Sequence, residues 1–281
     1  MSRLPLILTL LGLGAAGVCA QPPTSPGERG HRALQEAGPQ PAPLSFVIVH
    51  GAWGGGWDWR PVSDILTSRG HRAVRVTLTG LGERRHLASP SVDLETHITD
   101  VVNTILFEDL KSVTLVGHSY GGMVITGVAD RIPDRLARVV YLDAFVPEDG
   151  ESVVSLNGGQ PLRGVQGDVI IPAWVEPGAA PPTDVPHPLR TFTQPIALSN
   201  PLRNTIPTTY ILTVDPGAAS DPFEPFARRA AAKGWSVEQL DTDHNAQRSA
   251  RQELCALLEM TTSERRSGAP SPEAPPAELR R

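Results

Sequence analysis

The sequence has little cysteine, and this excludes several kinds of site. It contains two cysteines in 281 residues, Cys19 and Cys255. We expect Cys19 to be removed with a leader, which leaves Cys255 unable to form an internal disulfide. Cys255 falls in the apolar helical pattern "ELCALLEM" and is expected to be a small buried hydrophobe. A cysteine nucleophile or a thiolate metal site is therefore disfavoured, and neither a metal nor a cofactor is expected.

The sequence also lacks an excess of positive charge. Its formal net charge is −5, and lysine and arginine form no dense cluster. It therefore has no basic field of the kind that nucleic-acid binding requires, and no nucleic-acid partner is expected. A length of 281 residues allows one large α/β domain or two small ones, with an ample core.

A run long enough to span a membrane is missing too. The apolar stretch "LPLILTLLGLGAAG" near the start is short for a spanning helix, which needs about 20 residues. Arg3 precedes this stretch, and the small residues Val18 and Ala20 follow it. This pattern predicts a signal peptide over residues 1–20 and export to the periplasm or the medium, without stable membrane insertion. A lipid anchor at Cys19 is the alternative, and Val18 directly before it disfavours that anchor.

The rest of the chain divides into a folded part and two flexible ends. Residues 21–43 and 263–281 are rich in proline, glycine and polar residues, which predicts a flexible leader and a disordered tail. Within residues 44–262, helix-like stretches alternate with short apolar runs. These runs predict strands at 45–50, 72–78, 112–117, 138–143, 208–215 and 235–240. The alternation predicts an α/β fold with a doubly wound, mostly parallel sheet.

One long segment interrupts this alternation. Residues 146–207 are full of prolines and glycines and lie before the penultimate predicted strand. Long insertions of this kind are often functional, and open parallel sheets bind ligands at the carboxyl ends of their strands. We therefore predict that 146–207 forms a small irregular lid over that edge of the sheet.

The stretch "VGHSYGG", residues 116–122, lies between a predicted strand and a predicted helix. It contains G-x-S-x-G, a weak pattern alone, but this placement is that of a nucleophile elbow. Gly117 and Gly121 give a tight turn room free of Cβ atoms, and Gly122 lets the helix approach the sheet. Ser119 is therefore the candidate nucleophile, at a helix N-terminus that favours developing negative charge.

A serine hydroxyl needs a base to remove its proton. His244 follows the last predicted strand in "DTDHNAQ", which fits the chain order Ser…Asp…His, and we assign it as the general base. His50 is expected to anchor its loop by hydrogen bonds. His187 is expected to be exposed in the lid, and His97 to be polar surface or loop scaffolding.

Two aspartates are candidates for the acid that orients His244. Asp215 in "ILTVDPG" closes the penultimate predicted strand and is favoured. Asp143 in "VYLDAF" closes the strand before the lid and is the reserve candidate, otherwise structural or pocket-lining.

An acyl-transfer site also needs donors for the oxyanion. The backbone N–H of Tyr120 comes directly after the nucleophile, and that of Ala52 lies in the glycine-dense loop "HGAWGGGWDW". In the same loop Trp53 is a candidate to line the substrate pocket, as is Trp174 in the lid.

With these residues in place, the chain resembles an α/β-hydrolase of the branch that holds salicylate-type methyl esterases, hydroxynitrile lyases and bacterial carboxyl or aryl esterases. The likeness rests on "FVIVHGAWGGGWDW", "TLTGLGERRHLASP", "LVGHSYGGMVITGVADR", "YLDAFVPEDGES" and "DHNAQRSARQELCALL", met in that order. Carried over by position, Ser119, Asp215 and His244 match the family triad, and Ala52 and Tyr120 its oxyanion donors. The stretch "TLTGLGERRHL" has no assigned role.

The resemblance implies a serine esterase that acts on small carboxylic esters with an apolar or aromatic part. Hydroxynitrile lyases of this branch carry a threonine and a lysine where this chain has Gly51 and Asn245, so lyase activity is disfavoured. Two alternatives stay open: a cofactor-free lyase or perhydrolase with the same triad, and a small-molecule binding protein on a hydrolase scaffold. The sequence does not indicate the oligomeric state.

Overall fold

The computed structural model describes residues 42–218 and 221–263. The predicted signal peptide over 1–20, nearly all of the predicted leader and nearly all of the predicted tail lie outside these residues. Within them, no helix combines the length and the hydrophobicity needed to cross a bilayer.

The described elements follow the predicted alternation of strands and helices. In chain order they are β1 (Ser45–Val49), η1 (Gly56–Trp59), α1 (Arg60–Ser68), β2 (Arg72–Val76), η2 (Gly82–Leu87), α2 (Leu94–Phe107), β3 (Val113–His118), α3 (Gly121–Arg131), η3 (Pro133–Arg135), β4 (Leu136–Leu142), α4 (Val153–Leu156), β5 (Val165–Gln166), β6 (Val169–Ile170), β7 (His187–Pro188), α5 (Arg190–Thr193), η4 (Pro201–Thr205), β8 (Thr208–Thr213), α6 (Glu224–Ala232), β9 (Ser236–Leu240), α7 (Ala246–Ser249) and α8 (Arg251–Ser263). The helical stretch after β9 is divided into α7 and α8, because the backbone leaves the helical region at Ala250 between them.

Six strands form the central sheet, in the order β2-β1-β3-β4-β8-β9. Every neighbouring pair is parallel, which confirms the predicted fold class. The strand order reverses at β1: the chain adds β2 on one side of β1 and β3 on the other. The carboxyl ends of all six strands therefore meet at one edge, where open α/β sheets bind ligands.

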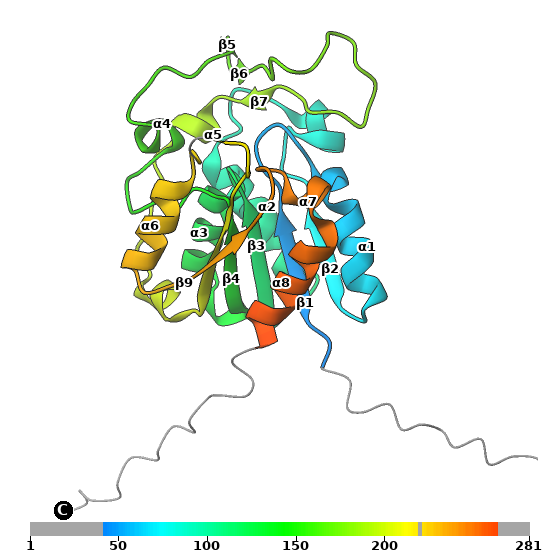
Figure 1. Ribbon diagram of the computed structural model, residues 1–281. Coiled ribbons are helices and arrows are strands. Elements are labelled where there is room, and N and C mark those ends of the chain that lie inside the picture. The colour runs from blue at the N-terminus through cyan, green and yellow to red at the C-terminus, as the bar shows by residue number, and fades with distance from the viewer. Residues whose placement is uncertain (1–41, 219–220, 264–281) are drawn as a thin grey trace, which may run out of the picture. The chain divides into compact units, whose positions relative to one another are not determined.

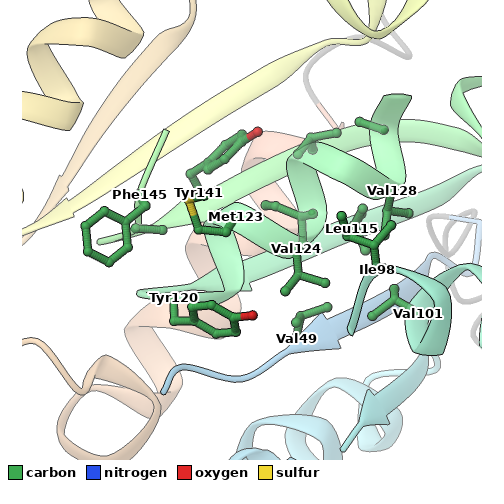
Figure 2. Packing of buried hydrophobic residues seen from close by; sticks show 14 of the residues in the cluster. Val49, Ile98, Val101, Leu115, Tyr120, Met123, Val124, Val128, Tyr141 and Phe145 are labelled. Carbon is green, nitrogen blue, oxygen red and sulfur yellow. The ribbon is translucent and has the colours of Figure 1, made fainter. Parts of the chain in front are cut away.

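Helices cover both faces of this sheet (Figure 1). Because successive strand side chains point to opposite faces, β1 sends Val47 and Val49 to one face and Phe46 and Ile48 to the other. The first face packs against α2, α3 and α6, and Figure 2 shows part of that cluster. The second face packs against α1 and α8 and includes Cys255, which is fully buried as predicted.

The turn after β3 has the geometry expected of a nucleophile elbow. Ser119 has a φ of 53°, a left-handed conformation that is costly for a residue with a side chain. The turn is possible because glycines follow it. A Cβ on Gly121 would lie 2.8 Å from the carbonyl oxygen of Val49, and one on Gly122 only 2.1 Å from that of Phe145. Helix α3 thus begins in direct contact with the strand ends, as predicted for Gly122.

Replacing Gly122 with alanine should therefore destabilise the protein strongly. The new methyl group meets backbone on its nearest side, which cannot swing away as a side chain would. We expect a loss of at least about 3 kcal/mol in the free energy of unfolding, measured by urea denaturation. Gly217→Ala is the matched control, because its nearest contact is 3.6 Å away at the Asp215 side chain. Equal stability of the two variants would contradict the packing described for α3.

The insertion between β4 and β8 lies above the carboxyl edge of the sheet (Figure 1). It is less irregular than predicted, because it contains a small antiparallel sheet in the order β5-β6-β7 and the short helices α4 and α5. Its packing is substantial: Val153, Ile170, Val185 and Phe192 belong to the main hydrophobic core. We keep the name lid for residues 146–207.

Candidate active site

A cavity of about 330 Å³ lies where the lid meets the strand ends. Ser119 and His244 both line it, although 125 residues separate them in the chain. Ala52, Trp53 and Trp174, which the sequence suggested for the oxyanion site and the substrate pocket, line the same cavity. The rings of Trp53 and Trp174 meet edge to face, with centroids 4.9 Å apart. The cavity thus brings together candidate residues from four separate parts of the chain.

His244 is held by a carboxylate at the end of β4. Its Nδ1 lies 2.5 Å from Oδ2 of Asp143. The Asp143 side chain is 1% exposed and that of His244 is 38% exposed, so the pair is buried at the carboxylate and open at the imidazole. The other carboxylate oxygen of Asp143 accepts a hydrogen bond from the Thr213 N–H at 3.3 Å. The ends of β4 and β8 therefore hold the Asp143 carboxylate in place. Because this carboxylate contacts Nδ1 of His244, the other ring nitrogen, Nε2, faces away from it.

The preference for Asp215 as this acid is corrected by the geometry. Asp215 lies in an exposed turn two residues beyond the end of β8, and its carboxylate accepts a hydrogen bond from the Gly217 N–H at 3.0 Å. The loop that carries His244 returns across the sheet to the end of β3, where the His118 Nε2–H donates to the His244 carbonyl at 2.8 Å. From this place the adjacent strand end is that of β4. The carboxylate beside His244 is thus the reserve candidate, Asp143.

Two aromatic rings pack against the His244 imidazole, and no sequence pattern indicated either contact. Phe223 stacks on it with centroids 4.8 Å apart and planes 12° apart. The His118 ring lies 4.6 Å away at 41°. Burial lowers the pKa of His118 well below its usual value, so this ring is neutral and packs against His244 without opposing a positive charge there. Phe223 precedes α6, and only the fold brings it to the site.

The predicted oxyanion donors sit on backbone that is firmly fixed. Tyr120 follows Ser119 and caps α3, and its hydroxyl donates to Nδ1 of the buried His97 at 2.9 Å. Ala52 lies in the loop after β1, next to His50. The Leu78 N–H donates to His50 Nε2 at 3.2 Å, so His50 Nδ1–H donates to the Gly51 carbonyl at 2.7 Å. His50 therefore anchors this loop, as expected.

The lid is fastened to the same loop through Trp53. The Trp53 N–H donates to His187 Nδ1 at 3.0 Å, its carbonyl accepts from the Val185 N–H at 2.9 Å, and its indole N–H donates to the Ile170 carbonyl at 3.0 Å. His187 is fully buried, so the expectation that it is exposed is wrong. Burial lowers its pKa well below the usual value, which keeps Nδ1 unprotonated as an acceptor. The remaining Nε2–H donates to Thr191 Oγ1 at 2.8 Å.

Comparison with known proteins places this geometry in a family. A family model described as "Alpha/beta hydrolase family" matches residues 46–257, which span every strand of the central sheet but the first residue of β1. The chain belongs to this family. A "Carbendazim hydrolyzing esterase" of Nocardioides sp. (strain SG-4G) is 39% identical over 238 residues, covering 76% of this chain and 98% of that protein.

Other relatives of this alpha/beta hydrolase are plant and bacterial proteins. A "Pheophorbidase" of Raphanus sativus is 28% identical over 79% of the chain and 95% of its own length. An extracellular alpha/beta-hydrolase from a Paenibacillus species, described as sharing homology with tobacco salicylic acid binding protein 2, superposes with a TM-score of 0.66 at 26% identity. That match covers 78% of this chain and 99% of the other. The resemblance to this branch is thereby confirmed.

His97 was expected to be polar surface or loop scaffolding, and in the hydrolase it is a buried scaffold. It is fully buried and its Nε2–H donates to the Thr79 carbonyl at 2.9 Å. Burial lowers its pKa from 6.5 to about 3. Between these two pH values the unfolded chain binds a proton that the folded chain does not, so stability is lost as the pH falls below about 6.5.

This loss can be measured on the hydrolase. We expect the free energy of unfolding to fall by up to about 1.4 kcal/mol per pH unit for His97 alone. Chemical denaturation at pH 7 and pH 5 should show a smaller pH dependence in His97→Gln than in the wild type. His86→Gln, at an exposed histidine of η2, is the matched control. An unchanged dependence in His97→Gln would show that His97 is not the buried neutral group described here.

Proposed function

We propose that the protein is a serine carboxylesterase in which Ser119, His244 and Asp143 act together. The observation that carries this proposal is the 2.5 Å contact between His244 Nδ1 and Asp143 Oδ2, at a cavity that Ser119 also lines. A carboxylate at Nδ1 leaves Nε2 as the basic nitrogen of the neutral imidazole. The left-handed turn at Ser119 supports the same conclusion, because strained backbone persists where the surrounding structure enforces it.

In this mechanism His244 Nε2 takes the proton of the Ser119 hydroxyl as its oxygen attacks the ester carbonyl. The carbonyl oxygen becomes negative and is stabilised by the backbone N–H groups of Ala52 and Tyr120. His244 then gives its proton to the leaving alcohol, and Asp143 stabilises the imidazolium in the interval. Water, deprotonated by His244, releases the carboxylic acid and restores the serine.

The cavity supports a small substrate with an apolar or aromatic part. Its volume of about 330 Å³ lies at the lower end of the range for small-molecule sites. Trp53 and Trp174 supply apolar surface, and they come from opposite sides, the core loop and the lid. The likeness to a carbendazim-hydrolysing esterase and to plant methylesterases agrees with an ester or a related acyl substrate.

A hydroxynitrile lyase is less well supported. The positions that carry threonine and lysine in those lyases are Gly51 and Asn245 here, and both line the cavity. No lysine is found among the described residues that line it, so no ammonium group faces a departing cyanide there. A Cβ on Gly51 would also lie 2.9 Å from His118 Nδ1 and 3.1 Å from the Ser119 Cβ, leaving little space for a larger residue.

Labelling and turnover together test the proposal. A fluorophosphonate probe should label the protein, peptide mass spectrometry should place the label on Ser119, and pre-labelled protein should no longer hydrolyse p-nitrophenyl acetate. A panel of p-nitrophenyl and methyl esters, graded by acyl length, should show turnover that falls once the acyl group outgrows the cavity. Labelling without turnover of any ester would support the binding-protein alternative instead. Turnover of mandelonitrile above that of the esters would favour the lyase.

We also propose that the protein is exported. The support is the N-terminal pattern of Arg3, an apolar stretch and small residues near Ala20, together with the extracellular location named for the Paenibacillus relative. Fractionation of expressing cells, with N-terminal sequencing of the mature protein, tests it. Intact Met1 in the cytoplasmic fraction would contradict it.

A further inference from the structure

A second and larger cavity, of about 540 Å³, lies beside the lid and shares no lining residue with the cavity at Ser119. Three arginines line it: Arg60 at the start of α1, Arg75 in β2 and Arg85 in η2. We call it the arginine cavity. The lid segment 183–185 separates the two, because Thr183 and Val185 line the arginine cavity and Asp184 lines the other.

The arginine cavity carries an excess of positive charge. Arg60, Arg75 and Arg85 form no ion pair with any carboxylate of the described residues. Among the described residues that line the cavity, only Glu83 carries a carboxylate. Elsewhere in the described chain arginines commonly have acidic partners, as Arg229 has in Glu151. Three guanidinium groups without an ion pair line this one cavity, although the chain has a net charge of −5. Arg75 Nη1 also donates to the Gly56 carbonyl at 2.8 Å, which holds its guanidinium in place.

The rest of the cavity wall is apolar and partly aromatic. Trp57, Pro181, Pro182 and Val185 line it together with the arginines. Trp57 is half-buried, and the Arg248 guanidinium packs over its ring at 5.7 Å from the centroid. A flat apolar group can pack against such a wall while an attached anion meets the guanidinium groups, which match carboxylates in geometry and charge.

The stretch "TLTGLGERRHL", which has no role in the proposed catalysis, builds one side of this cavity. A Cβ on Gly82 would lie 3.2 Å from Gly55 Cα, so glycine lets η2 pack against the loop after β1. Arg84 Nη1 donates to the Thr77 carbonyl at 2.9 Å, and its Nη2 lies 3.3 Å from Asp100 Oδ1. These contacts hold η2 in place and leave its neighbour Arg85 directed to the cavity.

We propose that the arginine cavity is a binding site for a small aromatic carboxylate. A volume of about 540 Å³ accommodates a one- or two-ring molecule. The carboxylate pairs with Arg60, Arg75 and Arg85, and the ring packs against Trp57 and the proline wall. The proposal stands apart from ester hydrolysis, because no residue of the arginine cavity takes part in the catalytic mechanism.

Isothermal titration calorimetry of the full chain with 2-naphthoate tests this site. We expect the double variant Arg60→Ala/Arg85→Ala to bind 2-naphthoate at least about tenfold more weakly than the wild type. Arg163→Ala removes an equally unpaired, exposed arginine that lies outside the cavity, and it should bind as the wild type does. The neutral analogue 2-naphthamide should bind the wild type at least about tenfold more weakly than the acid, because it cannot pair with guanidinium groups.

The main competing explanation is that the acid binds in the cavity at Ser119 instead. Trp174→Ala removes a side chain that lines that cavity and does not line the arginine cavity, and it should leave 2-naphthoate binding unchanged if the arginine cavity is the site. The proposal is overturned if Trp174→Ala abolishes binding while the double arginine variant retains it, or if acid and amide bind equally. A thermal unfolding midpoint of Arg60→Ala/Arg85→Ala equal to that of the wild type shows that this variant is folded, so its loss of binding is informative whatever the fate of the esterase proposal.

Discussion

Ser119→Ala is expected to lower kcat for p-nitrophenyl acetate by about 10⁴- to 10⁶-fold while the protein stays folded. The reason is that alanine removes the only atom that attacks the ester, so no acyl-enzyme can form. Some rate above that of water should remain, because the Ala52 and Tyr120 N–H groups still stabilise an oxyanion formed by direct attack of water. Stopped-flow measurement of the p-nitrophenol burst distinguishes hydrolysis through an acyl-enzyme from direct attack by water. The burst should be absent in Ser119→Ala, because no acyl-enzyme forms.

The matched control is Ser89→Ala, which removes an exposed serine hydroxyl from the loop after η2. It should keep wild-type kcat and KM. The Ser119→Ala variant should keep the wild-type thermal unfolding midpoint, because alanine occupies the same backbone conformation, with φ near 53°, at the same cost as serine. A kcat for Ser119→Ala within tenfold of the wild type would refute the assignment of the nucleophile.

The sheet and the elbow could be predicted from the sequence because their causes are local. The inner strands are short apolar runs, and the helices between the strands begin at recognisable signals. Pro61 lies in the first turn of α1, and Asp93 accepts a hydrogen bond from the Thr96 N–H at 3.0 Å to cap α2. The glycines around Ser119 are likewise read from the sequence, because only residues without a Cβ fit that turn.

The acid and the burial of the lid histidine could not be predicted, because both depend on contacts between distant segments. Asp143 and Asp215 both follow strands at the same edge of the sheet, so the sequence pattern does not distinguish them. The choice is made by the His244 loop, whose carbonyl is held over β3 by His118 across 126 residues of chain. His187 lies among prolines and glycines that suggest exposure, yet its partner is the Trp53 N–H, 134 residues away.

Asp143→Asn is expected to lower kcat/KM for p-nitrophenyl acetate by about 10³- to 10⁴-fold at neutral pH. An asparagine at 143 can turn its amide oxygen to the Thr213 N–H that now donates to Asp143 Oδ1, and its NH₂ group then faces His244. An NH₂ group donates to Nδ1, so the ring proton moves to Nε2, and His244 can no longer accept the proton of Ser119. The serine stays in place, and only its base is disabled.

Asp215→Asn is the comparison that decides the acid. It makes the same chemical change at an exposed turn, where the carboxylate bonds the Gly217 N–H and does not contact His244. Its kcat/KM should stay within about twofold of the wild type, as is usual for surface substitutions away from a site. The two variants differ only in the position of the same chemical change. A larger loss of kcat/KM in Asp215→Asn than in Asp143→Asn would therefore mean that the His244 loop rearranges during catalysis to meet the end of β8. If only Asp143→Asn loses kcat/KM, and fluorophosphonate labels Ser119 more slowly in that variant, Asp143 is the group that maintains the basicity of His244.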